Sequence, residues 1–134
     1  MLTEKAPSTI AIVDDDKTFR FIFSVQLLEI NDSNKILQFD DGYTILEYLL
    51  ENKENPELLP DIIFLDLTMK RLDGWVFIEE FDNIKKYLPK DIVIHILTGS
   101  NEQINKMKAS VSPHISNYLN KPVSNIQLKE LIYS

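Results

Sequence analysis

The stretch IAIVDDD, residues 10–16, joins four apolar residues directly to three aspartates, and IIFLD, residues 62–66, repeats the design with one aspartate. Apolar runs of this length without alternating polar residues are typical of strands in a parallel sheet that is covered on both faces. Residues 35–39, 92–97 and 115–119 form three more short apolar runs. The sequence therefore predicts five strands, two of which end on carboxylates.

The segments between these strands carry apolar residues at helical spacing, as in the stripe of Phe21, Val25 and Leu28 with Ile22 beside it. A more polar helix is expected over residues 104–111. Strict alternation of strands and helices predicts an α/β fold with a parallel five-stranded sheet and right-handed crossovers. We expect residues 1–8 to form a flexible tail and residues 9–134 to form a single domain.

Composition excludes several classes of function. The chain has 134 residues, of which 14 are Lys or Arg and 21 are Asp or Glu, so its formal net charge is −7. This balance argues against binding to nucleic acid or anionic lipid. The chain has no cysteine, which excludes disulfides and thiol chemistry, and it has no apolar run that could span a membrane. We expect a cytoplasmic protein.

Polar residues follow the strand ends where an open parallel sheet binds its ligands. Asp14–Asp16 follow the first strand, Asp66 the third, Thr98 the fourth and Lys121 the fifth. Crowded carboxylates repel one another unless a cation binds, and oxygen ligands suit a hard ion such as Mg2+. The alternative is that the aspartates cap the next helix, a role that we expect for Asp16.

An aspartate beside a cation and a lysine has the parts needed for phosphoryl transfer. Asp66 could attack phosphorus to form an acyl phosphate, while Asp14 and Asp15 hold the ion and Lys121 pairs with a phosphoryl oxygen. Taken alone, Lys121 could equally be a solvated loop lysine and Thr98 an ordinary strand residue. Tyr118 could likewise be half-buried packing near the end of its strand.

Five motifs in order resemble the receiver domain of two-component response regulators, from residue 9 onward. They are Val13-Asp14-Asp15, Leu65-Asp66, Met69 with Asp73-Gly74, Leu97-Thr98-Gly99, and Tyr118-Leu119-Asn120-Lys121-Pro122. The resemblance implies a flavodoxin-like, doubly wound (βα)5 fold with strand order 2-1-3-4-5. It also implies that the protein is a phosphorylated switch in a phosphorelay and not an enzyme in the ordinary sense.

The resemblance assigns further roles. It implies Mg2+ held by Asp15, Asp66 and the Thr68 backbone carbonyl, and by Asp14 at least through water. The donor would be a phosphohistidine on a sensor histidine kinase or a histidine phosphotransfer protein. Thr98 and Tyr118 would be the switch residues, and a downstream protein would bind the face of the fourth helix, fifth strand and fifth helix.

Thr68 and Ser100 are expected to tune hydrolysis of the acyl phosphate. They stand two residues after Asp66 and Thr98, the positions that the family uses for this purpose. Both are small hydroxyl residues that would leave the path of the attacking water open, so we expect a moderate rate of loss.

Two other functions fit the same fold class. A Mg2+-dependent phosphohydrolase with an aspartyl nucleophile usually has a second acid two residues later, where this chain has Thr68. A flavin-binding electron carrier would need a phosphate-binding loop where Asp14–Asp16 would repel the phosphate. Because the chain ends soon after the fifth helix, we expect it to act by docking to another protein or by relaying phosphate.

Overall fold

The computed structural model describes residues 7–67, 69, 74–99 and 115–133. The elements along the chain are β1 (Thr9–Val13), α1 (Lys17–Ile30), β2 (Lys35–Phe39), α2 (Gly42–Glu51), η1 (Pro56–Leu58), β3 (Ile62–Asp66), α3 (Gly74–Ile84), η2 (Lys85–Tyr87), β4 (Val93–Thr98), β5 (Ile115–Asn120) and α5 (Asn125–Tyr133). The strand predictions hold to within one residue at each end. The helix expected over residues 104–111 lies outside the described residues.

The five strands form one parallel sheet in the order β2-β1-β3-β4-β5, as predicted. Val13 in β1 lies opposite Leu65 in β3, so Asp14 and Asp66 leave the sheet as neighbours. On the other side of β3, Asp66 lies opposite Leu97, one residue before Thr98. The register of the strands therefore brings the predicted acids and Thr98 to one edge.

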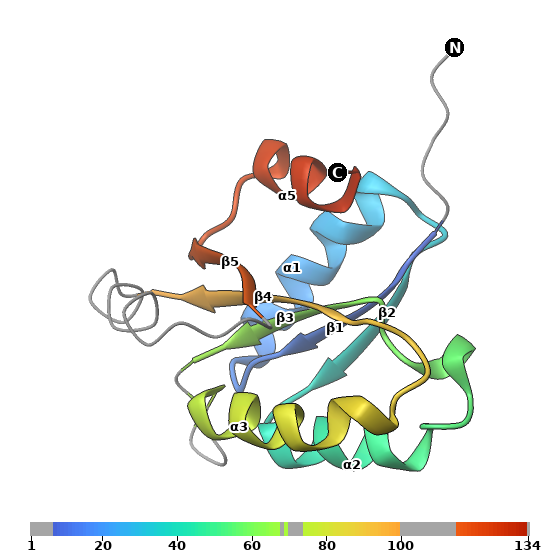
Figure 1. Cartoon of the computed structure of the whole chain (residues 1–134). Helices are drawn as coiled ribbons and strands as arrows, with labels where there is room; N and C mark the ends of the chain where they lie inside the picture. Colours follow the sequence, from blue (N-terminus) through green and yellow to red (C-terminus); the bar gives the residue numbers. More distant parts are fainter. Residues whose placement is uncertain (1–6, 68, 70–73, 100–114, 134) are drawn as a thin grey trace.

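Helices cover both faces of the sheet, with α1 and α5 on one face and α2 and α3 on the other (Figure 1). Alternate residues of each strand enter opposite apolar clusters, because successive side chains point to opposite faces. In β1, Ala11 and Val13 join the cluster under α2 and α3, whereas Ile10 and Ile12 join the cluster under α1 and α5. Burial on both faces explains why residues 10–13 of β1 and residues 62–65 of β3 are all apolar.

Helix α1 is turned so that the stripe noticed in the sequence faces solvent. Phe21 and Ile22 are 66% and 55% exposed, and Val25 and Leu28 are exposed as well. The buried side carries Phe23, which meets Phe64 of β3 edge-on with ring centroids 5.0 Å apart. The helix has apolar residues on two sides, and packing against the sheet selects the side that contains Phe23.

His95 is a buried histidine in the middle of β4. It is 3% exposed, its ring centroid lies 5.3 Å from that of Phe64, and the Asn117 amide nitrogen lies 3.4 Å from its Nδ1. Burial lowers the pKa of His95 from 6.5 to about 4, because the charged imidazolium loses its hydration. His95 therefore stays neutral in the folded protein above about pH 4, as expected for a structural residue.

This histidine should make the fold sensitive to acid. Below pH 6.5, His95 binds a proton in the unfolded chain but not in the folded protein. The free energy of unfolding therefore falls as the pH drops from 6.5 toward 4. Glutamine does not titrate, so we expect the free energy of unfolding of His95→Gln to fall by about 2 to 3 kcal/mol less than that of wild type over this window. Urea unfolding of both proteins across the window measures the difference, and parallel pH curves would contradict the prediction.

Candidate functional site

Three carboxylates meet at the edge of the sheet where β1 and β3 end. One carboxylate oxygen from each of Asp14, Asp15 and Asp66 lies within 4.8 Å of the others, with Asp14 and Asp66 buried and Asp15 exposed. An oxygen-only set that opens to solvent on one side is the chemistry that Mg2+ requires, since this ion keeps several waters. The described residues therefore fit a bound Mg2+.

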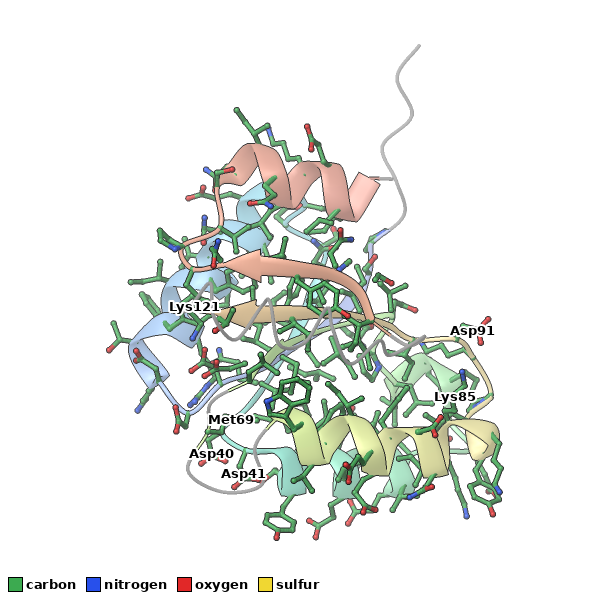
Figure 2. The ribbon with its side chains drawn as sticks, turned by 60° about the vertical axis from the view of Figure 1, so that its left-hand side comes forward. Asp40, Asp41, Met69, Lys85, Asp91 and Lys121 are labelled. Atoms are coloured by element: carbon green, nitrogen blue, oxygen red, sulfur yellow. The ribbon has the colours of Figure 1, made fainter. Side chains whose placement is uncertain are left out.

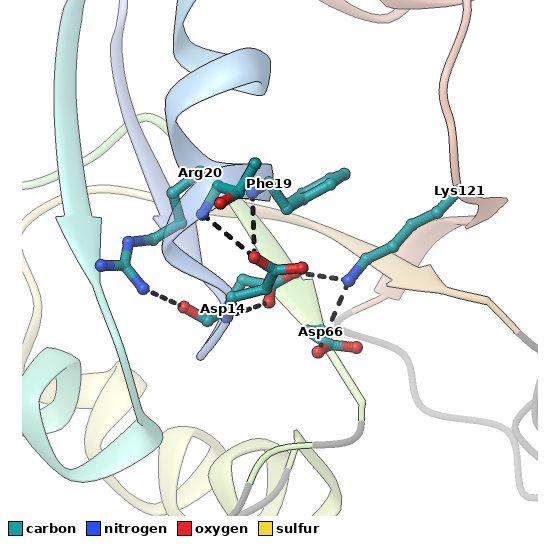
Figure 3. Close-up of polar contacts among 7 residues, drawn as sticks. Asp14, Phe19, Arg20, Asp66 and Lys121 are labelled. Carbon is teal, nitrogen blue, oxygen red and sulfur yellow. Dashed lines mark hydrogen bonds and ion pairs between the residues drawn. The ribbon is translucent and has the colours of Figure 1, made fainter.

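Lys121 extends from the end of β5 into this acidic cluster. Its Nζ lies 2.5 Å from Oδ2 of Asp14 and 3.6 Å from Oδ2 of Asp66. Dashed lines in Figure 3 mark both contacts. The lysine backbone is itself fixed, because its N–H donates to the carbonyl of Thr98 at 2.9 Å. One ammonium facing three carboxylates leaves negative charge in the cluster, which favours a divalent cation.

The three consecutive aspartates have separate tasks. Asp16 caps α1, because its side chain accepts hydrogen bonds from the backbone N–H groups of Thr18 and Phe19. The capping role predicted for Asp16 is thus confirmed. The buried Asp14 carboxylate instead accepts from the Asp16 N–H at 2.9 Å and from Lys121, while Asp15 points its carboxylate toward the cluster.

Arg20 and Phe19 belong to this site and were not singled out in the sequence. Arg20 Nη1 donates to the Asp14 carbonyl at 2.5 Å, and its Nε donates to the Gln38 side chain. The Phe19 ring lies beside the Lys121 ammonium. Both residues lie in the first turn of α1, directly after the three aspartates. That position in the sequence was the one feature that could have indicated their place in the site.

Gly74 allows α3 to begin against the end of β3. A Cβ atom at this position would lie 2.8 Å from both the Asp66 carbonyl oxygen and the Leu67 Cα, closer than such atoms approach. The Gly74 N–H donates to the Leu67 carbonyl at 3.0 Å. The Asp73-Gly74 motif therefore includes a steric requirement that fixes the backbone beside Asp66.

The remaining predicted site residues are placed unequally. Thr98 is buried at the end of β4, and Tyr118 is half-buried and packs against the cluster under α2 and α3. Thr68 and Ser100 lie outside the described residues. In Figure 2, Lys121, Met69 and the two aspartates that follow β2 lie toward one end of the sheet, and Lys85 and Asp91 toward the other.

The helices in the described part of the chain are all too short or too polar to cross a membrane.

Residues 10–133 match the sequence model of the response regulator receiver domain. The probable methanogenesis regulatory protein FilR2 of Methanothrix harundinacea is 22% identical over 132 residues, which cover 98% of this chain and 83% of that protein. A protein-glutamate methylesterase/protein-glutamine glutaminase of Xanthomonas campestris is 29% identical over 145 residues. That match covers 95% of this chain but 37% of the relative, so the chain spans well under half of its length.

Solved structures show the same fold. A two-component response regulator from Cytophaga hutchinsonii has a TM-score of 0.82 at 21% identity, with 96% of each chain covered. Chemotaxis protein CheY4 of Vibrio cholerae has a TM-score of 0.72 at 22% identity, with 96% of this chain and 98% of that chain covered. The fold, the acidic cluster and the family match from residue 10 to residue 133 agree: this chain belongs to the response regulator receiver domain family of two-component signalling.

Proposed function

We propose that the protein is a phosphoacceptor switch in a two-component or phosphorelay pathway. A carboxylate oxygen of Asp66 attacks the phosphorus of a phosphohistidine, the phosphorus–nitrogen bond breaks, and the imidazole of the donor leaves with a proton. One observation carries the proposal: Asp66 is nearly buried, lies 3.6 Å from the Lys121 ammonium, and shares a cluster with Asp14 and Asp15.

The side chains around Asp66 have complementary roles in this transfer. Asp14, Asp15 and Asp66 would hold Mg2+, with the Thr68 carbonyl as a further proposed ligand, and the bound ion would supply positive charge where phosphoryl oxygens approach. Lys121 pairs with Asp14 before transfer and with a phosphoryl oxygen afterwards. Thr98 would donate a hydrogen bond to the phosphoryl group, and Tyr118 would change its rotamer in response. Thr68 and Ser100 would control the rate at which the acyl phosphate is hydrolysed.

The runner-up is a Mg2+-dependent phosphohydrolase that uses the same aspartate. The two functions differ in turnover, because a switch is labelled once per protein whereas an enzyme consumes many substrate molecules. We expect a small acyl-phosphate or phosphoramidate donor to label the protein and an alkyl phosphate ester to remain intact. Steady release of inorganic phosphate from the ester, faster than in an Asp66→Asn variant, would favour the phosphohydrolase.

The affinity for Mg2+ should depend on Asp15 and not on Asp16. Asp15 lies in the acidic cluster and Asp16 caps α1, so Asp15→Ala should weaken Mg2+ binding by at least about tenfold. Asp16→Ala should leave Mg2+ affinity within about twofold and lower the stability by about 1 kcal/mol through the lost cap. Isothermal titration and urea unfolding measure the two effects, and a larger loss of Mg2+ affinity in Asp16→Ala would refute the assignment.

The exposed stripe on α1 supports docking of the phosphohistidine protein. Phe21, Ile22, Val25 and Leu28 are 39% to 66% exposed, and the same helix begins beside the acidic cluster. A protein that covers the stripe would lie next to Asp66, where its phosphohistidine must arrive.

Docking on α1 can be tested by comparing protein and small-molecule donors. We expect Phe21→Glu to slow transfer from the cognate histidine phosphotransfer protein by at least about tenfold, because it charges the apolar stripe. Transfer from a small phosphodonor should stay within about twofold of wild type. Leu50→Glu, on the exposed side of α2, is the matched control and should change neither rate. Equal loss with both donors would assign the effect to folding and not to docking.

Signal output is proposed on the face of the fourth helix, β5 and α5. The segment expected to form the fourth helix lies outside the described residues. In the described part, Ser116 and Asn117 of β5 and Ile126 of α5 are exposed, so side chains on this face are open to a downstream protein. The proposal places the protein in the cytoplasm, with the histidine kinase that phosphorylates it directly or through a phosphotransfer protein.

A further inference from the structure

Phe19 contacts the lysine of the acidic cluster through the face of its ring. The Lys121 Nζ lies 4.3 Å from the centroid of the Phe19 ring, and both side chains are drawn in Figure 3. A cation above an aromatic face is attracted by the negative charge of the π system. The contact joins the first turn of α1 to the end of β5, across the edge of the sheet where phosphoryl transfer would occur.

The position of the Phe19 ring is fixed by its packing on Phe23. It stacks on Phe23 with centroids 5.3 Å apart and an interplanar angle of 18°, and Phe23 meets Phe64 of β3 edge-on. The Asp16 cap receives the Phe19 N–H, which fixes the backbone as well. Phe19 is therefore the last ring of an aromatic row that begins on the strand that carries Asp66.

The ring can orient the ammonium without competing for it. Lys121 has a flexible four-carbon stem, and an ammonium ion donates three hydrogen bonds. Asp14 takes one at 2.5 Å and Asp66 lies at 3.6 Å, while the ring covers another side. An aromatic face attracts the charge but is a poor hydrogen-bond acceptor, so the N–H that must reach a phosphoryl oxygen stays available.

We propose that Phe19 is a positioning residue that holds the Lys121 ammonium toward Asp66. The inference rests on the proposed phosphoryl transfer to Asp66, although the contact itself can be tested without it. Loss of the ring should lower the rate of transfer, because Lys121 would sample other directions. Binding of Mg2+ and of a small phosphodonor should change little, since neither needs the ring.

The test compares Phe19→Leu with Phe19→Tyr, which keeps the aromatic face. With acetyl phosphate and saturating Mg2+, we expect Phe19→Leu to lower the maximal rate of Asp66 phosphorylation by about three- to tenfold, with the half-saturating donor concentration unchanged. Phe19→Tyr should stay within about twofold of wild type. Tyr87→Leu is the matched control, because the Lys86 Nζ lies 5.3 Å from the centroid of the Tyr87 ring. Tyr87 belongs to η2, which contributes no residue to the acidic cluster.

A spectroscopic measurement separates this inference from the proposed function. In wild type and Phe19→Tyr, the ring current should move the Lys121 ε-methylene proton resonances upfield, and Phe19→Leu should remove that shift. If wild type is not phosphorylated but the shift is present, the proposed function fails and the Phe19 contact stands. If wild type is phosphorylated and Phe19→Leu reacts at the same rate, or if Phe19→Tyr is as slow as Phe19→Leu, the positioning role is wrong.

Discussion

Replacing Lys121 with methionine is expected to slow phosphorylation of Asp66 by roughly 100- to 1,000-fold. The ammonium lies 3.6 Å from Oδ2 of Asp66 and is only partly exposed, so solvent would replace it poorly during transfer. Negative charge from the carboxylate and from the phosphoryl oxygens converges at this point, and Lys121 is the cation that the described residues supply there. Methionine has a similar length and apolar stem, so it removes the charge with little change in shape.

The control for this variant is a lysine in a comparable ion pair elsewhere. Lys90 pairs with Asp61 at 3.0 Å, and Asp61 precedes β3 at the end opposite Asp66. Lys90→Met should leave the rate within about twofold, because this partly exposed ion pair contributes little and acts on no reacting group. A time course of intact mass with acetyl phosphate and saturating Mg2+ gives both rates. Similar rates for Lys121→Met and Lys90→Met would exclude Lys121 from the transfer.

Most of the fold could be predicted because two-sided burial leaves a clear trace in the sequence. The runs over residues 10–13 and 62–65 contain no polar residue, a pattern typical of strands in a parallel sheet that is covered on both faces. The rule that parallel strands present their carboxyl ends at one edge then grouped Asp14, Asp66 and Lys121. The structure confirms that grouping, although Lys121 follows Asp14 by 107 residues.

The orientation of α1 could not be predicted because its sequence offers two apolar sides. Phe21, Val25 and Leu28 repeat at helical spacing, and so do Phe19, Phe23 and Leu27. Periodicity identifies a helix but does not say which side meets the sheet, and the edge-on contact between Phe23 and Phe64 decides this. The contact of Phe19 with Lys121 depends on which side of α1 meets the sheet, so it could not be predicted either.

Asp66 should accept one phosphoryl group, and Asp66→Asn should accept none. Asparagine keeps the shape of the side chain but lacks the anionic oxygen that attacks phosphorus, so the covalent step has no nucleophile. Asp16→Asn is the matched control from the same edge of the sheet. Asparagine caps a helix about as well as aspartate, so this variant should be labelled like wild type.

The most direct measurement is the intact mass of wild type, Asp66→Asn and Asp16→Asn after incubation with acetyl phosphate, with and without Mg2+. We expect the added mass of one phosphoryl group on wild type and Asp16→Asn when Mg2+ is present. We also expect hydroxylamine, which cleaves acyl phosphates, to remove this mass. Labelling of Asp66→Asn to the same extent as wild type, or equal labelling of wild type without Mg2+, would contradict phosphorylation of Asp66 at a Mg2+ site.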